Sequence, residues 1–307
     1  MANLKEIRNR IASVINTQQV TSAMKLVAAS KLRKAQEQIF ATRPYAFKIH
    51  EFISEMQASI DPETHPLLKP HTELNNVLIV LISADRGLAG AFNTNVIKKA
   101  ESLIKDEYAE FEASGNLFML CLGRKGHDYF ARRGARLVGD YRGYFQNLNI
   151  RHNDEVEDLI REGYLEGKWD KVVIVYNEFR NTISQNLIAE PFLPIPHERF
   201  ITPVMEKFTD EAHQYHPTKN FKDQYIFEPD AASLVNELIP RYLNLQLWRM
   251  CLESNAAEQG ARMVAMENAT NNAGELLRQL KLTYNRERQA AITKEIIEVS
   301  SGADALG

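Results

Sequence analysis

The chain has 307 residues, of which 44% are hydrophobic and 25% charged, the proportions of an ordinary folded protein. Its net charge of -3 is too small to indicate a highly charged partner. Cys121 and Cys251 form no disulfide or zinc-binding pattern, and the longest apolar run, residues 77–82, is far shorter than the ~20 residues that span a bilayer. These features argue against a disulfide scaffold and a membrane-spanning helix, and they favour a reducing compartment.

The first predicted element is a long helix over residues 3–59. Asn3 is a candidate N-cap, with Glu6 three residues later as in a capping box, and Pro44 is expected to kink or interrupt the helix. Its apolar residues alternate in steps of four and three, but the stripe is expected to shift sideways twice: Leu4, Ile7, Ile11, Val14, then Val20, Met24, Val27, then Ala28, Leu32, Ala35, Ile39.

The middle of the chain changes period. Loop residues 61–70 precede a run, residues 77–82, that has the pattern of a strand buried on both faces. Helices are predicted over 94–111, 125–133 and 154–165, and strands over 117–122, 172–176 and 183–192, the last one antiparallel. Strands that alternate with helices favour an α/β domain with a mostly parallel, Rossmann-like sheet over residues 75–227. Residues 194–220 are predicted to form an extended loop or arm.

The last predicted element is one very long helix that begins near Asp230 and contains Pro240. From residue 241 to residue 299 it would be roughly 90 Å long. Its seam repeats every 3.5 residues, the spacing of a coiled coil, and apart from Arg249, Gln259, Thr270 and Glu287 its members are apolar: Leu238, Tyr242, Leu245, Arg249, Leu252, Ala256, Gln259, Met263, Met266, Thr270, Ala273, Leu277, Leu280, Tyr284, Glu287, Ala291. The Arg, Lys and Glu residues of this helix are interpreted as a solvated face, and this interpretation includes Arg249 although Arg249 also falls on the seam.

Neither long helix can bury its stripe alone, so the two ends of the chain are expected to pack together. The predicted fold class is α/β, with a long antiparallel coiled coil of the N- and C-terminal helices and a central Rossmann-like domain. The predicted domains are residues 1–59 for the first coiled-coil helix, 75–227 for the α/β domain and 228–307 for the second coiled-coil helix.

Three stretches are candidates for chemistry, each with an alternative. The loop Ser83–Gly90 lies where a Rossmann domain holds phosphates, but its glycine spacing is wrong, so a tight turn between strand and helix is favoured. His213 and His216 have no accompanying ligand at metal-binding spacing, so a solvated loop is favoured over a metal site. The basic first helix lacks interleaved aromatic residues before Phe40 and Tyr45, which disfavours nucleic-acid binding.

The end of the chain carries the most specific motif. Residues 292–303, ITKEIIEVSSGA, satisfy every specified position of an Ile/Val-Thr-x-Glu-x-x-Glu/Asp-x-x-x-Gly-Ala pattern and resemble the signature of the gamma subunit of F-type ATP synthase. Residues 7–33 are similar to that family's opening helix, residues 258–270 to its C-terminal helix, and residues 83–93 to its Asp-Arg-Gly-Leu loop. The resemblance therefore covers both ends and the middle, in the family's order.

This resemblance implies a rotor subunit without catalytic, metal or cofactor sites. In the family, the terminal helices form an asymmetric shaft inside a hexamer of alpha and beta subunits. The α/β domain is a foot on the c ring beside the epsilon subunit, and proton flow through the ring turns ring and shaft together. ATP forms in the beta subunits, whose conformations the shaft selects, and nucleic acid has no part. The alternative is a nucleotide-binding α/β enzyme with a coiled-coil assembly arm.

The resemblance also implies site residues and a location. The residues that match beta-subunit contacts of the family are Met24, Lys25, Arg262, Arg288, Gln289, Thr293, Glu295 and Glu298, and an apical bearing is expected at Val299, Ala303, Ala305 and Leu306. The chain has Ala89 where many members have cysteine, and it lacks the paired cysteines of the chloroplast type, so no thiol regulation is expected. A start without a targeting segment favours a peripheral protein on the cytoplasmic face of a bacterial inner membrane.

Overall fold

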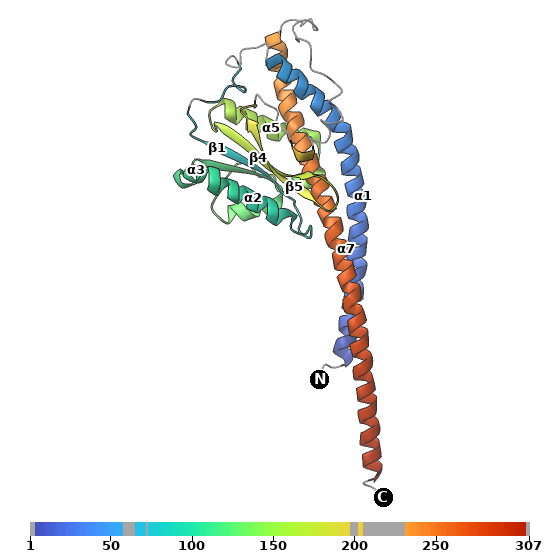
Figure 1. Ribbon diagram of the computed structural model, residues 1–307. Coiled ribbons are helices and arrows are strands. Elements are labelled where there is room, and N and C mark those ends of the chain that lie inside the picture. Colours follow the sequence, from blue (N-terminus) through green and yellow to red (C-terminus); the bar gives the residue numbers. More distant parts are fainter. Residues whose placement is uncertain (1–3, 58–64, 72, 197–201, 205–230, 305–307) are drawn as a thin grey trace. The chain divides into compact units, whose positions relative to one another are not determined.

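The computed structural model describes residues 4–57, 65–71, 73–196, 202–204 and 231–304. In chain order, a long helix precedes and another follows a central series of strands and shorter helices (Figure 1). Their bounds are α1 Leu4–Gln57, β1 Val77–Ile82, α2 Phe92–Glu107, α3 Ala109–Ser114, β2 Leu117–Leu122, α4 Arg124–Ala131, β3 Arg136–Leu137, the 3-10 helix Tyr144–Asn147, α5 Ile150–Leu165, β4 Lys171–Phe179, β5 Gln185–Leu193 and α7 Ala231–Asp304. The chain divides into two compact units, residues 1–29 with 262–307, and residues 30–261.

The second unit, residues 30–261, is built on a five-stranded sheet in the order β3-β2-β1-β4-β5. Strands β1, β2, β3 and β4 run parallel, and β5 pairs antiparallel with β4. Every residue of β1 is buried, because helices cover both faces of the sheet. The predicted mixed α/β class and the antiparallel last strand are both confirmed.

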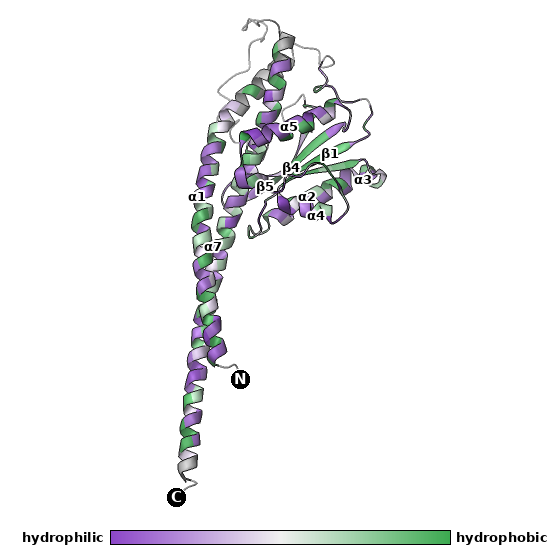
Figure 2. Ribbon diagram, turned by 180° about the vertical axis from the view of Figure 1, so that it is seen from behind, coloured by the Kyte–Doolittle hydropathy of each residue, from purple (hydrophilic) through white to green (hydrophobic). Residues whose placement is uncertain are grey.

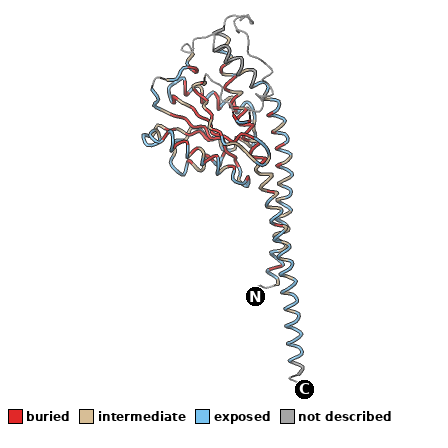
Figure 3. Tube along the Cα trace, viewed as in Figure 1, coloured by how far each residue is buried: buried red, intermediate tan, exposed pale blue. Residues whose placement is uncertain are grey.

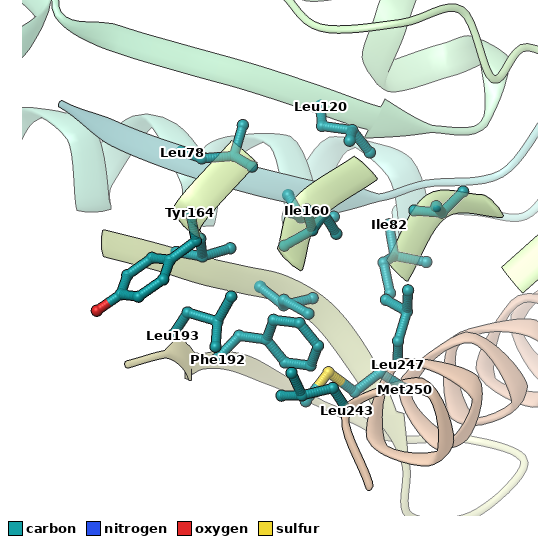
Figure 4. Close-up of a cluster of buried hydrophobic side chains, with 14 of the residues drawn as sticks. Leu78, Ile82, Leu120, Ile160, Tyr164, Phe192, Leu193, Leu243, Leu247 and Met250 are labelled. Atoms are coloured by element: carbon teal, nitrogen blue, oxygen red, sulfur yellow. The ribbon is translucent and has the colours of Figure 1, made fainter. Parts of the chain in front are cut away.

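One face of the sheet packs against α5 and α7. Alternate residues of the central strands, including Leu78, Ile82 and Leu120, enter this core together with Ile160 and Tyr164 of α5. Figure 4 shows Leu243, Leu247 and Met250 of α7 against Phe192 and Leu193 of β5 in the same core. The other face of the sheet packs against α2 and α4 in a separate core that contains Val77, Ile79, Leu81, Val96, Ala100 and Phe130.

Two short elements were not predicted, and one predicted helix is divided. The expected helix over 94–111 breaks at Tyr108 into α2 and α3. Strand β3 has only two residues, Arg136 and Leu137, and the 3-10 helix has four, so neither is long enough to show a period. The helix α1 continues through Pro44, and α7 through Pro240, so neither proline ends its helix.

Several expectations lie outside the described residues. They are the N-cap at Asn3, the histidines His213 and His216, and most of the arm over 194–220. Of that arm, Ile195 is described, and its backbone N–H donates to the carbonyl oxygen of Leu67 at 2.9 Å.

The interpretation of Arg249 as part of a solvated face is wrong. Its side chain is 2% exposed and forms an ion pair with Glu190 of β5, with 2.7 Å between Nη2 and Oε1. Burial is the largest influence and opposes the charge of Arg249, but the attraction and hydrogen bonds of Glu190 and Tyr176 together raise the pKa of Arg249 above its ordinary value. The 3.5-residue period also places Arg249 on the seam, and the structure agrees with that placement. A charge is tolerated there because Glu190 lies beside it.

A second buried carboxyl gives the unit a pH-dependent stability. The side chain of Glu157 on α5 is 3% exposed, and burial raises its pKa to about 7 although Arg161 lies 3.1 Å away and acts in the opposite direction. Since the folded state holds this proton more tightly than the unfolded state, its contribution to stability is present below pH ~4.5 and is lost as the pH rises to about 7.

We therefore expect Glu157→Gln to become progressively more favourable than the parent chain as the pH rises. Between pH 5 and pH 8 the difference in the free energy of unfolding should move toward the variant by about 1–3 kcal/mol, measured by urea denaturation of the full chain. Glu162→Gln, an exposed position on the same helix, is the control. A difference that is constant across this range would show that Glu157 is ionised throughout.

Candidate functional site on the coiled coil

The first unit, residues 1–29 with 262–307, is a pair of helices that run antiparallel. Figures 1 and 2 show the start of α1 alongside α7. Residue numbers fall along α7 as they rise along α1 in the side-chain contacts that join them: Arg8 Nη2 donates to Tyr284 OH at 3.0 Å, Thr270 Oγ1 to Thr21 Oγ1 at 2.8 Å, and Lys25 Nζ to Glu267 Oε1 at 2.6 Å. The predicted antiparallel pairing of the chain's two ends is confirmed.

The predicted seam of α7 faces this partner helix. Each seam position from Met263 to Ala291 is buried or half-buried, and Met266 and Ala273 are 4% and 8% exposed. Apolar residues off the seam are left in the open: Leu276 is 45% exposed and Leu282 is 64% exposed. The 3.5-residue spacing therefore identified the contacting face correctly, because a coiled coil keeps one stripe toward its partner over many turns.

The predicted shift of the α1 stripe is wrong in this unit. Val20 and Val27 are 57% and 56% exposed, while the half-buried positions continue the original four-three alternation through Gln18, Thr21 and Lys25. Thr21 and Lys25 can occupy the seam because α7 offers them polar partners, Thr270 and Glu267. Following hydrophobicity alone misses such a stretch, whereas an unbroken heptad spacing would have found it.

Gly274 leaves room for the end of the Gln18 side chain on the facing helix. A Cβ atom at this position would lie 3.1 Å from the Nε2 atom of Gln18, tighter than ordinary contact. An alanine here would therefore require the Gln18 side chain to shift slightly beside the polar stretch of the seam.

The last turns of α7 have no partner helix among the described residues. All of the residues from 292 to 301 are exposed, and Figure 3 shows this end of α7 in the colour of exposed residues. Four of them are apolar: Ile292 at 48%, Ile296 at 63%, Ile297 at 58% and Val299 at 73% exposed. About 15 Å of helix carrying both polar and apolar side chains is therefore presented without a covering surface.

The candidate contact residues all fall in this first unit, in two groups. Met24, Lys25 and Arg262 are half-buried along the paired part of the coiled coil. Arg288, Gln289, Thr293, Glu295 and Glu298 are exposed at or beyond its end. Of the expected bearing residues, Val299 is exposed and Ala303 is in the last turn of α7, while Ala305 and Leu306 lie outside the described residues.

The polar candidate residues make local contacts within the coiled coil, and these contacts leave most of the side chains open to solvent. Thr293 Oγ1 donates to the carbonyl oxygen of Gln289 at 2.9 Å, and Lys294 lies 3.5 Å from Glu298 in an exposed ion pair. The pair of Lys25 and Glu267 is also partly open, with side chains 37% and 45% exposed, so it contributes at most ~1 kcal/mol. Sequence reasoning named Lys25 but missed Glu267, its partner.

The loop Ser83–Gly90 in the second unit forms a tight turn held by Asp85. Asp85 Oδ1 accepts from the backbone N–H groups of Arg124 at 3.0 Å and Gly143 at 2.8 Å, and Oδ2 accepts from that of Phe145 at 3.0 Å. The carboxylate of Asp85 thereby ties together three segments at the carboxyl ends of β1 and β2.

The same loop is closed on itself at the start of α2, the helix at which a phosphate would bind. The backbone N–H of Ala84 donates to Asn93 Oδ1 at 2.9 Å, and that of Phe92 donates to the carbonyl oxygen of Ala89 at 3.2 Å. The other side of the loop accepts from α4, where Lys125 N–H donates to the carbonyl oxygen of Ala84 and Gly126 N–H to the hydroxyl of Ser83. The geometry favours the turn interpretation of Ser83–Gly90 over a phosphate cradle.

We accordingly expect the isolated chain to bind neither ATP nor NAD at micromolar concentration, because the loop Ser83–Gly90 is closed by its own contacts and lacks the glycine spacing of a phosphate-binding loop. Equilibrium dialysis of the full chain against each labelled nucleotide measures this directly. Saturable micromolar binding of either one would support the alternative of a nucleotide-dependent enzyme.

The two cysteines are buried and unreactive. Burial raises the pKa of the Cys121 thiol and of the Cys251 thiol to about 12, so both remain protonated at neutral pH.

The described part of the chain offers neither a metal site nor a membrane helix. In the described ranges no cluster of three His, Cys, Asp or Glu side chains could bind a metal ion. No described helix combines the length and apolarity that crossing a bilayer requires.

Comparison with known proteins agrees with this geometry. The family model described as ATP synthase matches residues 3–306. The chain is 55% identical to the ATP synthase gamma chain of Salinibacter ruber and 49% identical to that of Chloroherpeton thalassium, and in both cases the match covers 100% of this chain and 99% of the relative.

Solved structures share the fold. A chain of the Euglena gracilis mitochondrial ATP synthase, described as OSCP/F1/c-ring in rotational state 3, is 20% identical with a TM-score of 0.62, covering 99% of this chain and 94% of the other. A chain of the rotor of that synthase, in rotational state 1, is 19% identical with a TM-score of 0.60, covering 94% and 98%. With a coiled coil of the two termini, a central α/β unit and full-length identity of 55% to a curated relative, this chain belongs to the ATP synthase gamma chain family.

Proposed function

We propose that this chain is the central shaft of an F-type ATP synthase and couples proton-driven rotation of a c ring to conformational cycling in catalytic beta subunits. The shaft forms and breaks no covalent bond itself. It acts by presenting different sides to the beta subunits as it turns. A rotating surface can change the populations of their conformations only through contacts that differ in free energy between those conformations.

The observation that carries this function is the uncovered end of α7. A monomeric rod with Ile292, Ile296, Ile297 and Val299 exposed in water would bury these side chains against a partner if one enclosed it. A sleeve formed by alternating alpha and beta subunits supplies such an enclosure. The asymmetry needed for a cam also follows, because two side-by-side helices of different sequence present different surfaces around the axis of the shaft.

The three parts of the chain divide this work. Residues 1–59 and 228–307 form the shaft, and residues 75–227 form the foot, which stands on the c ring beside the epsilon subunit. The chain associates with the membrane only through the c ring, as a peripheral protein on the cytoplasmic face of a bacterial inner membrane. Neither a cofactor nor nucleic acid takes part.

The candidate residues serve as a catch for the beta subunits. Met24, Lys25 and Arg262 contact a beta subunit along the paired helices, and Arg288, Gln289, Thr293, Glu295 and Glu298 do so near the tip. Charge-assisted hydrogen bonds suit this role because they are directional and can be exchanged as the orientation changes. The tip residues Val299, Ala303, Ala305 and Leu306 are small or apolar and form a bearing that binds nothing tightly.

Replacing Arg288 and Gln289 together by alanine tests the catch. We expect ATP turnover of the assembled complex to fall about tenfold or more, equivalent to ~1.4 kcal/mol of lost differential contact, while assembly survives because both side chains are exposed. Turnover is measured on purified complex matched for subunit content.

The chain supplies a sequence-matched control for this experiment. Arg278 and Gln279 form the same dipeptide on the same helix and are also exposed, so Arg278→Ala with Gln279→Ala should leave turnover near that of the parent complex. Equal turnover in the Arg288/Gln289 variant and the parent would remove these two residues from the catch.

The function as a whole is tested by isolating the complex through a tag on this chain and imaging it by electron microscopy. We expect alpha and beta subunits around the coiled coil and a c ring at the foot, and we expect the chain alone to hydrolyse no ATP. A complex in which the two termini lie apart, or an active isolated chain, would overturn the proposal.

A further inference from the structure

A buried polar cluster joins α7 to the sheet in the second unit. Arg249 Nη2 donates to Glu190 at 2.7 and 3.0 Å, Arg249 Nη1 donates to Tyr176 OH at 3.2 Å, and Tyr176 OH donates to Glu190 Oε2 at 2.7 Å. Gln246, one helical turn before Arg249, accepts from Arg249 Nε at 2.9 Å. We call Arg249, Glu190 and Tyr176 the triad.

The triad stands in the middle of an apolar contact. Glu190 is two residues from Ile188 and from Phe192 along β5, and both of these belong to the hydrophobic core on the α7 side of the sheet. Arg249 lies beside Leu247 and Met250 of α7, whose side chains enter that core. The triad is largely shielded from water, since Arg249 is 2% exposed and Glu190 is 7% exposed.

Global stability alone does not explain a charged pair at this place. Removing two charges from water costs several kcal/mol per ion, and apolar residues of similar volume are often as stable or more stable. What the ion pair adds to an apolar contact is direction. Apolar side chains tolerate small rotations and slides, whereas any turn of α7 about its axis would leave both charges buried without a partner.

We propose that the triad is a rotational clamp. It fixes the rotation of α7 about its own axis relative to the sheet, and so transmits torque between foot and shaft. This inference rests on the proposed function, because torque enters the foot only if the chain is a rotor. Arg249, Glu190 and Tyr176 are therefore positioning residues: they act through the geometry of α7 and touch no nucleotide.

A further contact along the same helix face supports the clamp. The backbone N–H of Phe179, at the end of β4, donates to Glu253 Oε2 at 3.2 Å, and Glu253 is 2% exposed. Gln246, Arg249 and Glu253 lie at helical spacings of three and four and so share one face of α7. Polar contacts at successive turns resist rotation better than a single one.

The decisive variant replaces the triad by apolar residues, Arg249→Met with Glu190→Leu and Tyr176→Phe, in the assembled complex. We expect its thermal midpoint to stay within about 5 °C of the parent and its ATP hydrolysis, measured with the c ring detached, to stay within about twofold. ATP synthesis by the intact complex in vesicles should fall at least fivefold, because only then does the foot carry a load.

Glu190→Gln serves as a second variant that keeps shape and hydrogen bonding if the apolar triad fails to fold, and we expect a smaller loss of the same kind. The exposed pair Arg241 and Glu237 on α7, changed to Gln at both positions, is the matched control and should lose neither activity. Parent-like ratios of synthesis to hydrolysis in both triad variants would overturn the clamp. Failure of the parent chain to enter a complex with alpha and beta subunits would instead overturn the proposed function.

Discussion

Asp85→Ala is expected to lower the free energy of unfolding of the full chain by about 3–5 kcal/mol, one of the two largest effects that the structure predicts. The substitution leaves three backbone N–H groups, those of Arg124, Gly143 and Phe145, without their acceptor. An unsatisfied buried donor costs about 1–3 kcal/mol, and partial access of water reduces the sum. Urea denaturation followed by circular dichroism measures the change.

Asp85→Asn should fall between the parent and the alanine variant. Its amide oxygen can still accept from Arg124 and Gly143, but its NH2 group would meet the N–H of Phe145, a donor facing a donor. Asp106→Ala is the control, because this carboxylate is exposed and accepts only a local hydrogen bond from Ser102 among the contacts described here. A loss below 1 kcal/mol for Asp85→Ala would mean that water replaces the carboxylate freely.

Arg249→Ala is expected to cost a similar amount, about 3–5 kcal/mol, because it leaves Glu190 buried without a counter-charge. Thermal unfolding of the full chain at neutral pH measures the loss.

Two comparisons isolate the ion pair from the loss of packing. Arg241→Ala removes an exposed arginine of the same helix that is paired with Glu237, and it should cost less than ~1 kcal/mol. Adding Glu190→Leu to Arg249→Ala should recover part of the lost free energy of unfolding, since it removes the buried carboxylate that Arg249→Ala leaves without a counter-charge. A double variant that is less stable by the full sum of the two single changes would argue that the two residues do not interact.

The motif at residues 83–93 illustrates how a recognisable sequence can have a structural cause. Its aspartate is needed as an acceptor for three backbone segments, and the chain following β2 must approach closely. A Cβ at Gly123 would lie 2.0 Å from the carbonyl oxygen of Ser83, and Gly123 has a φ of +105°, which favours glycine. Sequence reasoning rejected a nucleotide site here from the glycine spacing but could not identify these contacts.

The sequence by itself determined the elements whose signal is local and repeated. The seam of α7 from Met263 to Ala291 was predicted position by position, since a 3.5-residue period over many turns admits one face. The strands β1 and β2 were predicted with their observed bounds, because a continuous apolar run of six residues between breaks has few alternatives.

Only the tertiary structure decided where polar groups are buried. The seam of α1 passes through Gln18, Thr21 and Lys25 rather than Val20 and Val27, and Arg249 lies in the core rather than in water. A polar side chain is stable inside a protein only when a partner from a distant part of the chain satisfies it. Thr270, Glu267 and Glu190 are such partners, and their positions depend on how the chain folds back on itself, which no local period records.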